Sequence, residues 1–260
     1  MREICTKGLI CLDDSYGFVY KIAFISYTLR EDESYVYRFK PVYPVIDLLP
    51  PALFQGIPGL DLDARRDSYA RENMVPVFIS ERTPGENRQN LWQLLEKAEM
   101  DYLNRLQWLI STQSKYSGDD LYVKAYEASD EKRVHRVEDI RQYGKRAVDI
   151  YRNLLMIICY GDDLIAPGYE INDETRGLYY PLLMDLYKME KAYIDAQQAQ
   201  GIRRAAIEGR FKGRKPIAID DTKLAEVIGN YRAERLSADQ AAQKLGLSRS
   251  SFFRRLKTWS

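Results

Sequence analysis

The sequence predicts an α+β fold. It has a mixed body with a β-rich start and long helices, then a C-terminal domain of three helices arranged as a helix-turn-helix. Three observations predict it. Residues 1–50 are rich in Val, Ile, Phe and Tyr, residues from about 84 carry apolar side chains at helical spacing, and three short capped segments follow residue 219. At 260 residues, with 45% apolar and 12% aromatic content, the chain is large and apolar enough to bury a core.

The β-rich start contains a predicted hairpin. Two apolar runs, Gly17–Leu29 and Ser34–Ile46, flank the polar turn formed by residues 30–33, which is typical of antiparallel strands joined by a short loop. Prolines and glycines punctuate residues 47–85, so this stretch is expected to be mostly irregular. A further strand is expected at Leu121–Tyr126.

Three long helices are predicted in the body. The first covers about 84–111, because the Thr-Pro-Gly-Glu sequence at 83–86 has the pattern of a capping box and is followed by leucines at helical spacing. The second covers Val137–Tyr160. The third begins near Asn172 and continues past residue 200, with Pro181 either kinking it or lying in its first turn.

The formal net charge of +1 conceals an uneven distribution. Residues 201–260 contain 14 Lys and Arg against 6 Asp and Glu, a net charge of +8, whereas residues 1–200 contain 25 against 32, a net charge of −7. A basic segment attached to an acidic body indicates a polyanionic partner for the basic segment. The expected domains are an α+β partner-binding or sensing domain (1–130), a helical connector or dimerisation region (131–205), and a basic arm with a helix-turn-helix domain (206–260).

Three short helices are predicted in the basic segment, at Asp220–Arg232, Ala238–Leu245 and Arg249–Thr258. Serines 237 and 248 occupy the N-cap positions of the last two helices, and Gly246 allows the positive φ that a sharp turn between them needs. This layout is that of a helix-turn-helix. The residues expected to form its small core are Leu224, Val227, Ile228, Tyr231, Ala241, Ala242, Leu245, Leu247, Phe252, Phe253 and Leu256.

The last of these helices is the expected DNA-reading element, because its other residues are polar or basic and a helix fits the major groove of B-DNA. Arginine pairs bidentately with guanine and serine bonds several bases, whereas basic residues further along the helix meet phosphates. Base edges in the major groove are expected to contact Arg249, Ser250, Ser251 and Arg254, and phosphates to contact Arg255 and Lys257.

A basic arm precedes the three helices. The run Gly201–Pro216 has six Arg or Lys among its sixteen residues, and its glycines and proline make the second half extended. A flexible basic arm of this kind can enter the minor groove, where arginine finds a strongly negative potential. The residues expected at the minor groove or its phosphates are Arg210, Lys212, Arg214 and Lys215.

The sequences GIRRAAIEGRFKGRKP and LSADQAAQKLGLSRSSFFRRL together resemble the C-terminal part of serine recombinases of the resolvase/invertase group, which ends in a long helix, a Gly-Arg-Lys-Pro-like arm and a small helix-turn-helix. The resemblance runs from about Met189 to Lys257. It implies minor-groove contact by Arg214 and Lys215, and major-groove reading by Arg249, Ser250, Ser251 and Arg254.

The front of the chain departs from that group. The Tyr-Arg-Val-Ser pattern around the recombinase nucleophile is missing, and so are the arginines that hold the scissile phosphate. Ser26 is therefore interpreted as an ordinary strand residue, and no catalytic residue is assigned.

A second resemblance concerns the body. The sequence PVFISERTPGENRQNLWQLL followed by YSGDDLYVKAY is similar in layout to the small N-terminal domain of HipA-type toxin kinases, in which an aromatic-led strand, a proline-glycine turn and a helix precede another strand. The kinase domain has no counterpart in the chain. This resemblance implies a partner-binding or toxin-antitoxin-linked module.

No cofactor or metal site is expected, because the three cysteines have no metal-ligand spacing and the chain has a single histidine. Carboxylates in Tyr160–Leu164 and Glu170–Asp173 are interpreted as loop and cap residues, with metal binding or acid–base chemistry as the alternative. The N-terminus lacks a signal-peptide pattern and no long apolar run is present, so a cytoplasmic protein without a membrane span is expected.

The function expected from these features is sequence-specific binding of double-stranded DNA by a non-enzymatic homodimer. Its use would be bacterial or phage transcription regulation, or an accessory role in a mobile element, with the body binding a protein partner or a signal. Two alternatives stay open. One is an interaction protein of the toxin-antitoxin or inhibitor type that autoregulates through DNA binding, and the other is a diverged recombinase or nuclease.

Overall fold

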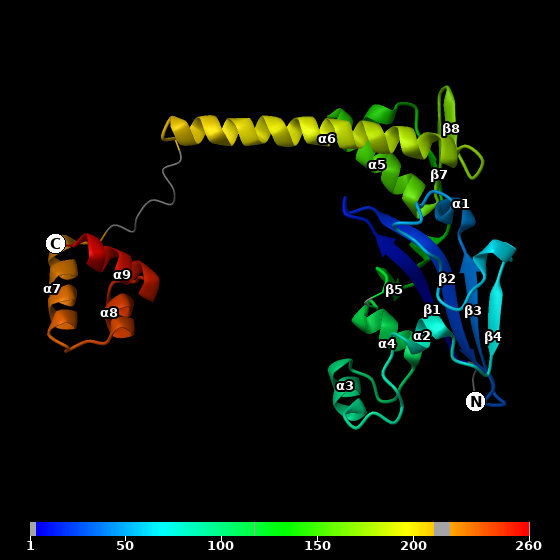
Figure 1. Ribbon diagram of the computed structural model, residues 1–260, viewed down its shortest axis with the longest axis horizontal. Helices are drawn as coiled ribbons and strands as arrows, with labels where there is room; N and C mark the ends of the chain where they lie inside the picture. The colour runs from blue at the N-terminus through cyan, green and yellow to red at the C-terminus, as the bar shows by residue number, and fades with distance from the viewer. Residues whose placement is uncertain (1–3, 117, 211–218, 260) are drawn as a thin grey trace. The chain divides into compact units, whose positions relative to one another are not determined.

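The computed structural model describes residues 4–116, 118–210 and 219–259. The chain forms two compact units, Met1–Gln197, called the body below, and Gln198–Ser260, called the C-terminal unit. The body is a mixed α/β structure with two sheets, and the C-terminal unit holds the end of a long helix and three short ones (Figure 1). The expected order, a β-rich start followed by helices, is confirmed.

A five-stranded antiparallel sheet with the order β4-β3-β2-β1-β5 forms the centre of the body. The predicted hairpin is confirmed: β2 and β3 pair, and the Arg30 N–H donates to the Ser34 carbonyl at 2.8 Å across the turn. The predicted strand near residue 121 is confirmed as β5. The strands are β1 (Ile4–Asp13), β2 (Val19–Leu29), β3 (Tyr35–Pro41), β4 (Tyr69–Glu72) and β5 (Leu121–Ala125).

One face of this sheet carries the main core. Alternate residues such as Ile10, Ile25 and Phe39 are buried, and α4 (Arg105–Thr112) packs on β1 and β5 with Leu106 and Leu109 fully buried (Figure 1). Shorter elements border the sheet: α1 (Tyr43–Ile46), α2 (Val77–Ser80), α3 (Leu91–Lys97), and the 3-10 turns η1 (Leu62–Ala64) and η2 (Ala128–Asp130).

The single helix expected at about 84–111 is wrong, because the segment forms two helices, α3 and α4. Glu99 has a left-handed backbone with φ 55°, and the Asn104 side chain caps α4 by accepting from the Gln107 N–H at 3.1 Å. Thr83 does not cap a helix; its hydroxyl donates to the Ile79 carbonyl at 2.9 Å. Both helices bury leucines in one core, so the apolar spacing continues across the break.

The predicted helix Val137–Tyr160 is shorter in the structure. It is preceded by the 3-10 turn η3 (Ile140–Tyr143), and α5 covers Ala147–Tyr160. The helical path is interrupted at Gly144, whose backbone is extended with φ 172° and ψ 160°, and α5 starts again after the N-cap residue Arg146. Residues 131–171 also add a second sheet with the order β6-β7-β8: β6 (Val134–Arg136), β7 (Asp163–Ala166) and β8 (Tyr169–Ile171).

The third long helix is confirmed as α6 (Arg176–Ile207). It begins four residues later than expected, because the Asn172 side chain accepts from the N–H groups of Glu174 and Thr175 and caps the preceding turn. Pro181 lies inside the helix. Within the described residues, no helix is both long and apolar enough to cross a membrane.

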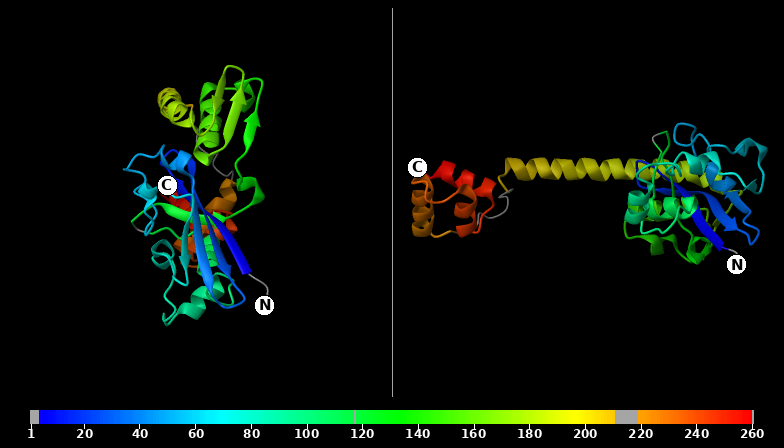
Figure 2. Two further views of the ribbon diagram at one scale, coloured as in Figure 1. Left: turned by 90° about the vertical axis from the view of Figure 1, so that its right-hand side faces the viewer. Right: turned by 90° about the horizontal axis from the view of Figure 1, so that it is seen from below.

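Three helices follow in the C-terminal unit: α7 (Asp221–Arg232), α8 (Ala238–Lys244) and α9 (Arg249–Thr258). The right-hand view of Figure 2 shows them packed against one another. They enclose a core of their own, separate from that of the body. The limits predicted from the sequence for these helices agree with the structure to within one residue.

Candidate nucleic-acid interface

The core of the C-terminal unit fixes the orientation of α9. Phe252 is fully buried, and its ring meets the ring of Tyr231 edge-on at 5.2 Å between centroids. Ala241 is also fully buried, in agreement with its predicted place in the small core. Because one side of α9 is tied to this core, the opposite side is presented to solvent.

The connection between α8 and α9 is a tight turn at Gly246, where φ is 66°. The Leu247 N–H donates to the Ala242 carbonyl at 2.9 Å and the Gly246 N–H to the Gln243 carbonyl at 3.1 Å, which is the bonding of a glycine-terminated helix end. A side chain at Gly246 would strain this left-handed backbone. The role predicted for this glycine is confirmed.

All three helices have side-chain caps. The Ser248 hydroxyl accepts from the Ser251 N–H at 3.3 Å, and Ser237 with Gln240 forms a reciprocal capping box at the start of α8. Asp220 caps α7; hydrogen bonds from the Thr222 side chain and from the backbone of the following turn hold the pKa of Asp220 below its usual value. Such caps contribute about 1 kcal/mol each, which matters in a unit this small.

The exposed side of α9 carries three of the predicted DNA-contacting residues. Ser250, Arg254 and Lys257 are exposed and follow one another at spacings of four and three residues, so they lie on one side of the helix. Phe253 was expected in the core, and this is wrong, because its side chain is 41% exposed and lies beside that polar side. The helical spacing explains the difference: Phe252 already fills the inward position.

Three other predicted residues have specific surroundings. Ser251 and Arg255 are half-buried on the flank of α9, and the Ser251 hydroxyl oxygen accepts from the Ser248 hydroxyl at 3.0 Å. Arg249, in the first turn of α9, pairs with Asp239 of α8, with 3.2 Å between the guanidinium and carboxylate. Both side chains are well exposed, so this ion pair is weak and screened by salt.

The basic arm is described only in part. Arg210 is exposed and pairs with Glu208 at 2.6 Å. Lys212, Arg214 and Lys215 lie outside the described residues. Their contact with the minor groove or phosphates stays a prediction.

The aspartates of the two acidic runs in the body contact basic side chains. Asp162 is buried and accepts from the backbone and side chain of Arg133, and it lies 3.1 Å from the His135 ring. Asp163 and Asp173 both pair with Lys132 and with the buried Arg176. These contacts favour the structural interpretation of the two acidic runs. Among the described residues, no group of three or more His, Cys, Asp or Glu side chains is arranged to hold a metal ion.

One cluster was missed by sequence reasoning. Strand register places Lys7 and Arg38 on either side of Ser26, a residue that the sequence presented only as an ordinary strand serine. The signal that could have found it is the alternation of basic residues along β3, but the pairing of the strands was needed as well.

No protein-family model matches the chain, and the search of curated proteins found no significant match. Function therefore has to be inferred from the residues and their geometry.

Proposed function

We propose that the protein binds double-stranded DNA sequence-specifically, and that its C-terminal unit is a helix-turn-helix domain with α9 as the recognition helix. The observation that carries the proposal is the two-sided character of α9. Phe252 anchors it to the core, while Ser250, Arg254 and Lys257 lie together on the exposed side. The unit has a net charge of +8, which suits a polyanion.

The dimensions and chemistry of α9 support this role. An α-helix with its side chains is about 10–12 Å across, and the major groove is about 12 Å wide. Arg254 has the planar fork that pairs with guanine, and Ser250 can donate to or accept from several bases. The exposed ring of Phe253 suits contact with a thymine methyl group. Lys257 and Arg255 lie nearer the end of the helix and suit phosphates.

Regulation of transcription is the use that we propose first, and an accessory role in a mobile element comes second. The similarity of residues 189–257 to the DNA-binding part of serine recombinases supports both. In either use the body would bind a partner or a signal, and the C-terminal unit would bind the protein to a DNA site. A toxin-antitoxin role has only the similarity of layout in the sequence of the body to support it. In the structure, the run at the place of the first strand of that layout forms the helix α2 instead.

The direct test compares residues 1–260 with a chain that ends at residue 219, using fluorescence anisotropy on a labelled duplex pool. We expect the full chain to bind with an affinity that falls steeply between about 50 and 200 mM salt, because phosphate contacts release counterions. The truncated chain should bind far more weakly, because it keeps only the basic arm. Equal binding by both chains would contradict the proposal.

The Arg249–Asp239 pair leads to a prediction that DNA binding becomes tighter, whereas most substitutions are expected to weaken it. Asp239→Asn removes a negative charge 3.2 Å from an arginine that is expected at the DNA. We expect duplex affinity to rise about threefold to tenfold at low salt, with the gain shrinking at high salt. The matched control is Glu226→Gln, which removes an exposed carboxylate from α7. An unchanged affinity in Asp239→Asn would place Arg249 away from the DNA.

We also propose that two copies of the chain associate through α6. One helix-turn-helix makes few contacts with DNA, and a dimer that binds two paired half-sites makes more. Opposite the buried Leu183, Met184 and Tyr187, the helix carries large exposed apolar side chains, with the exposed Asp185 among them. Their exposed fractions are Leu178 72%, Leu182 57%, Met189 64% and Tyr193 60%. At spacings of four, seven and four residues they share one side of the helix.

Met189→Glu tests this association. A charge in the middle of a buried apolar seam should weaken the dimer at least about tenfold, because an unpaired buried charge is costly. Light scattering at graded protein concentrations measures it. Gln198→Glu introduces the same charge on the opposite side of α6 and should leave the dimer unchanged. A wild-type chain that is monomeric at high concentration would exclude this seam.

A further inference from the structure

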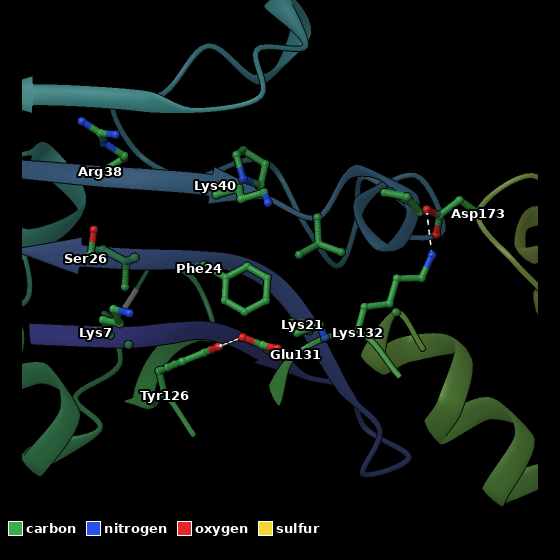
Figure 3. A pocket seen from close by; sticks show the side chains of 16 residues that line it. Lys7, Lys21, Phe24, Ser26, Arg38, Lys40, Tyr126, Glu131, Lys132 and Asp173 are labelled. Atoms are coloured by element: carbon green, nitrogen blue, oxygen red, sulfur yellow. Dashed lines mark hydrogen bonds and ion pairs between the residues drawn. The ribbon is translucent and has the colours of Figure 1, made fainter. Parts of the chain in front are cut away.

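The antiparallel register of the body sheet aligns basic side chains on one face. Lys7 of β1 pairs with Ser26 of β2, and Ser26 pairs with Arg38 of β3, so the three form a row across the strands. Figure 3 shows them in line. In the next row on the same face, Phe24 pairs with Lys40. Directly opposite residues are about 5 Å apart and successive rows about 7 Å apart.

These cations lack acidic partners. Lys7, Arg38 and Lys40 are exposed, and among the described residues none of the three forms an ion pair with a carboxylate. The Lys7 ammonium lies 5.8 Å from the centre of the Tyr126 ring, a cation–π contact. Residues 1–200 have a net charge of −7, so three adjacent cations without a carboxylate partner mark a place where a bound anion would be stabilised.

An aromatic and apolar wall adjoins the cations. Phe24 is half-buried in the middle of the face, and Pro41, Val42 and Pro44 line the same cavity. Beneath Phe24 lies the buried Lys21, whose ammonium is 5.5 Å from the Phe24 ring centre and donates to the Asp130 carbonyl at 3.0 Å. Burial lowers the pKa of this ammonium. The cavity therefore has a cationic end at the row of Lys7, Ser26 and Arg38. Towards its other end, the apolar residues lie beside Glu131 and the Lys132–Asp173 ion pair.

The volume and length of the cavity suit a small ligand. Its volume is about 640 Å³, within the range of about 300–1,000 Å³ that small-molecule sites occupy. Beyond the row of Lys7, the neighbouring row consists of the uncharged Cys5, Thr28 and Val36 and ends at the acidic Glu72 of β4. At the other end, Lys132 is already paired with Asp173 at 3.0 Å. The cationic surface is thus too short to follow a nucleic-acid strand.

We propose that this face of the sheet binds a free nucleotide, with its phosphates on the row of Lys7, Ser26 and Arg38 and its base against Phe24. Arg38 can hold a phosphate with two parallel hydrogen bonds, Lys7 and Lys40 add point charges, and the Ser26 hydroxyl donates one more bond. The apolar wall accepts the planar base. This site lies within the body and does not depend on DNA binding by the C-terminal unit.

Isothermal titration calorimetry of the full chain tests the site, with each of the four ribonucleoside triphosphates, inorganic tripolyphosphate and adenosine as probes. We expect at least one triphosphate to bind one per chain with a Kd below about 1 mM. Tripolyphosphate should bind more weakly and adenosine not measurably. Arg38→Gln should weaken the nucleotide about tenfold. Phe24→Leu should weaken the nucleotide but leave tripolyphosphate unchanged.

The C-terminal unit is also basic, so the decisive readout is the effect of substitutions in the body. Lys145→Gln removes an exposed charge of the body outside the cavity and should leave nucleotide affinity unchanged. Three results would overturn the inference. They are the absence of binding by all four triphosphates, equal binding by wild type and Arg38→Gln, and tighter binding of single-stranded oligothymidine than of nucleotides through the same residues. None of them bears on duplex binding by α9.

Discussion

Phe252→Ala is expected to unfold the C-terminal unit while leaving the body folded. Phe252 is fully buried and contacts the rings of Tyr231 and Phe253 at 5.2 and 5.7 Å between centroids. Truncation of a buried phenylalanine costs about 3–5 kcal/mol, which is comparable to the whole stability of a domain of this size. In a calorimetric scan, the transition of the C-terminal unit should disappear and duplex binding should be lost with it.

Phe253→Ala is the matched control. The two phenylalanines are neighbours in sequence, but the side chain of Phe253 is 41% exposed. We expect a loss of about 1 kcal/mol or less in the free energy of unfolding, with both transitions retained. Duplex affinity should fall only at sites that place a thymine methyl group against this ring. Equal destabilisation by the two substitutions would contradict the orientation of α9 described above.

Arg254→Ala is expected to have the largest effect on recognition without affecting folding. Arg254 is exposed on the side of α9 opposite Phe252. Loss of a bidentate contact with guanine costs about 1–3 kcal/mol at the preferred site, or roughly tenfold to a hundredfold in affinity. Affinity for unrelated duplexes should fall much less. The ratio of specific to unrelated affinity, measured at one salt concentration, should therefore fall sharply.

Arg235→Ala provides the comparison, because Arg235 is exposed on the same unit but lies between α7 and α8. This substitution removes the same charge. We expect a small decrease in affinity that is similar for specific and unrelated duplexes, as for a contact with phosphate. If Arg235→Ala reduced discrimination as much as Arg254→Ala, α9 would not be the reading element.

Local signals were sufficient to predict the C-terminal unit. Ser237 and Ser248 cap their helices as expected, and Gly246 has the positive φ that the turn needs. These features depend on residues within a few positions of one another. The sequence alone does not distinguish Phe252 from Phe253, because both are apolar. In the structure both rings meet Tyr231, and only Phe252 is fully buried.

The body was harder to predict, because its elements depend on distant contacts. Leucines at helical spacing predicted one helix at 84–111, yet Glu99 adopts a left-handed backbone and Asn104 starts a second helix. The extended backbone of Gly144 interrupts the helical path before α5. Likewise, the row of Lys7, Ser26 and Arg38 comes from three strands and exists only once their register is set.

Selection of bound sequences from a random duplex pool by residues 1–260 tests the central claim most directly. We expect one recurrent sequence, composed of two related half-sites whose centres are about 10 base pairs apart or a multiple of that distance. The same selection with Arg254→Ala should lose the preference at one position of each half-site. A pool without enrichment, or an enriched sequence that is still selected by a chain ending at residue 219, would contradict the account.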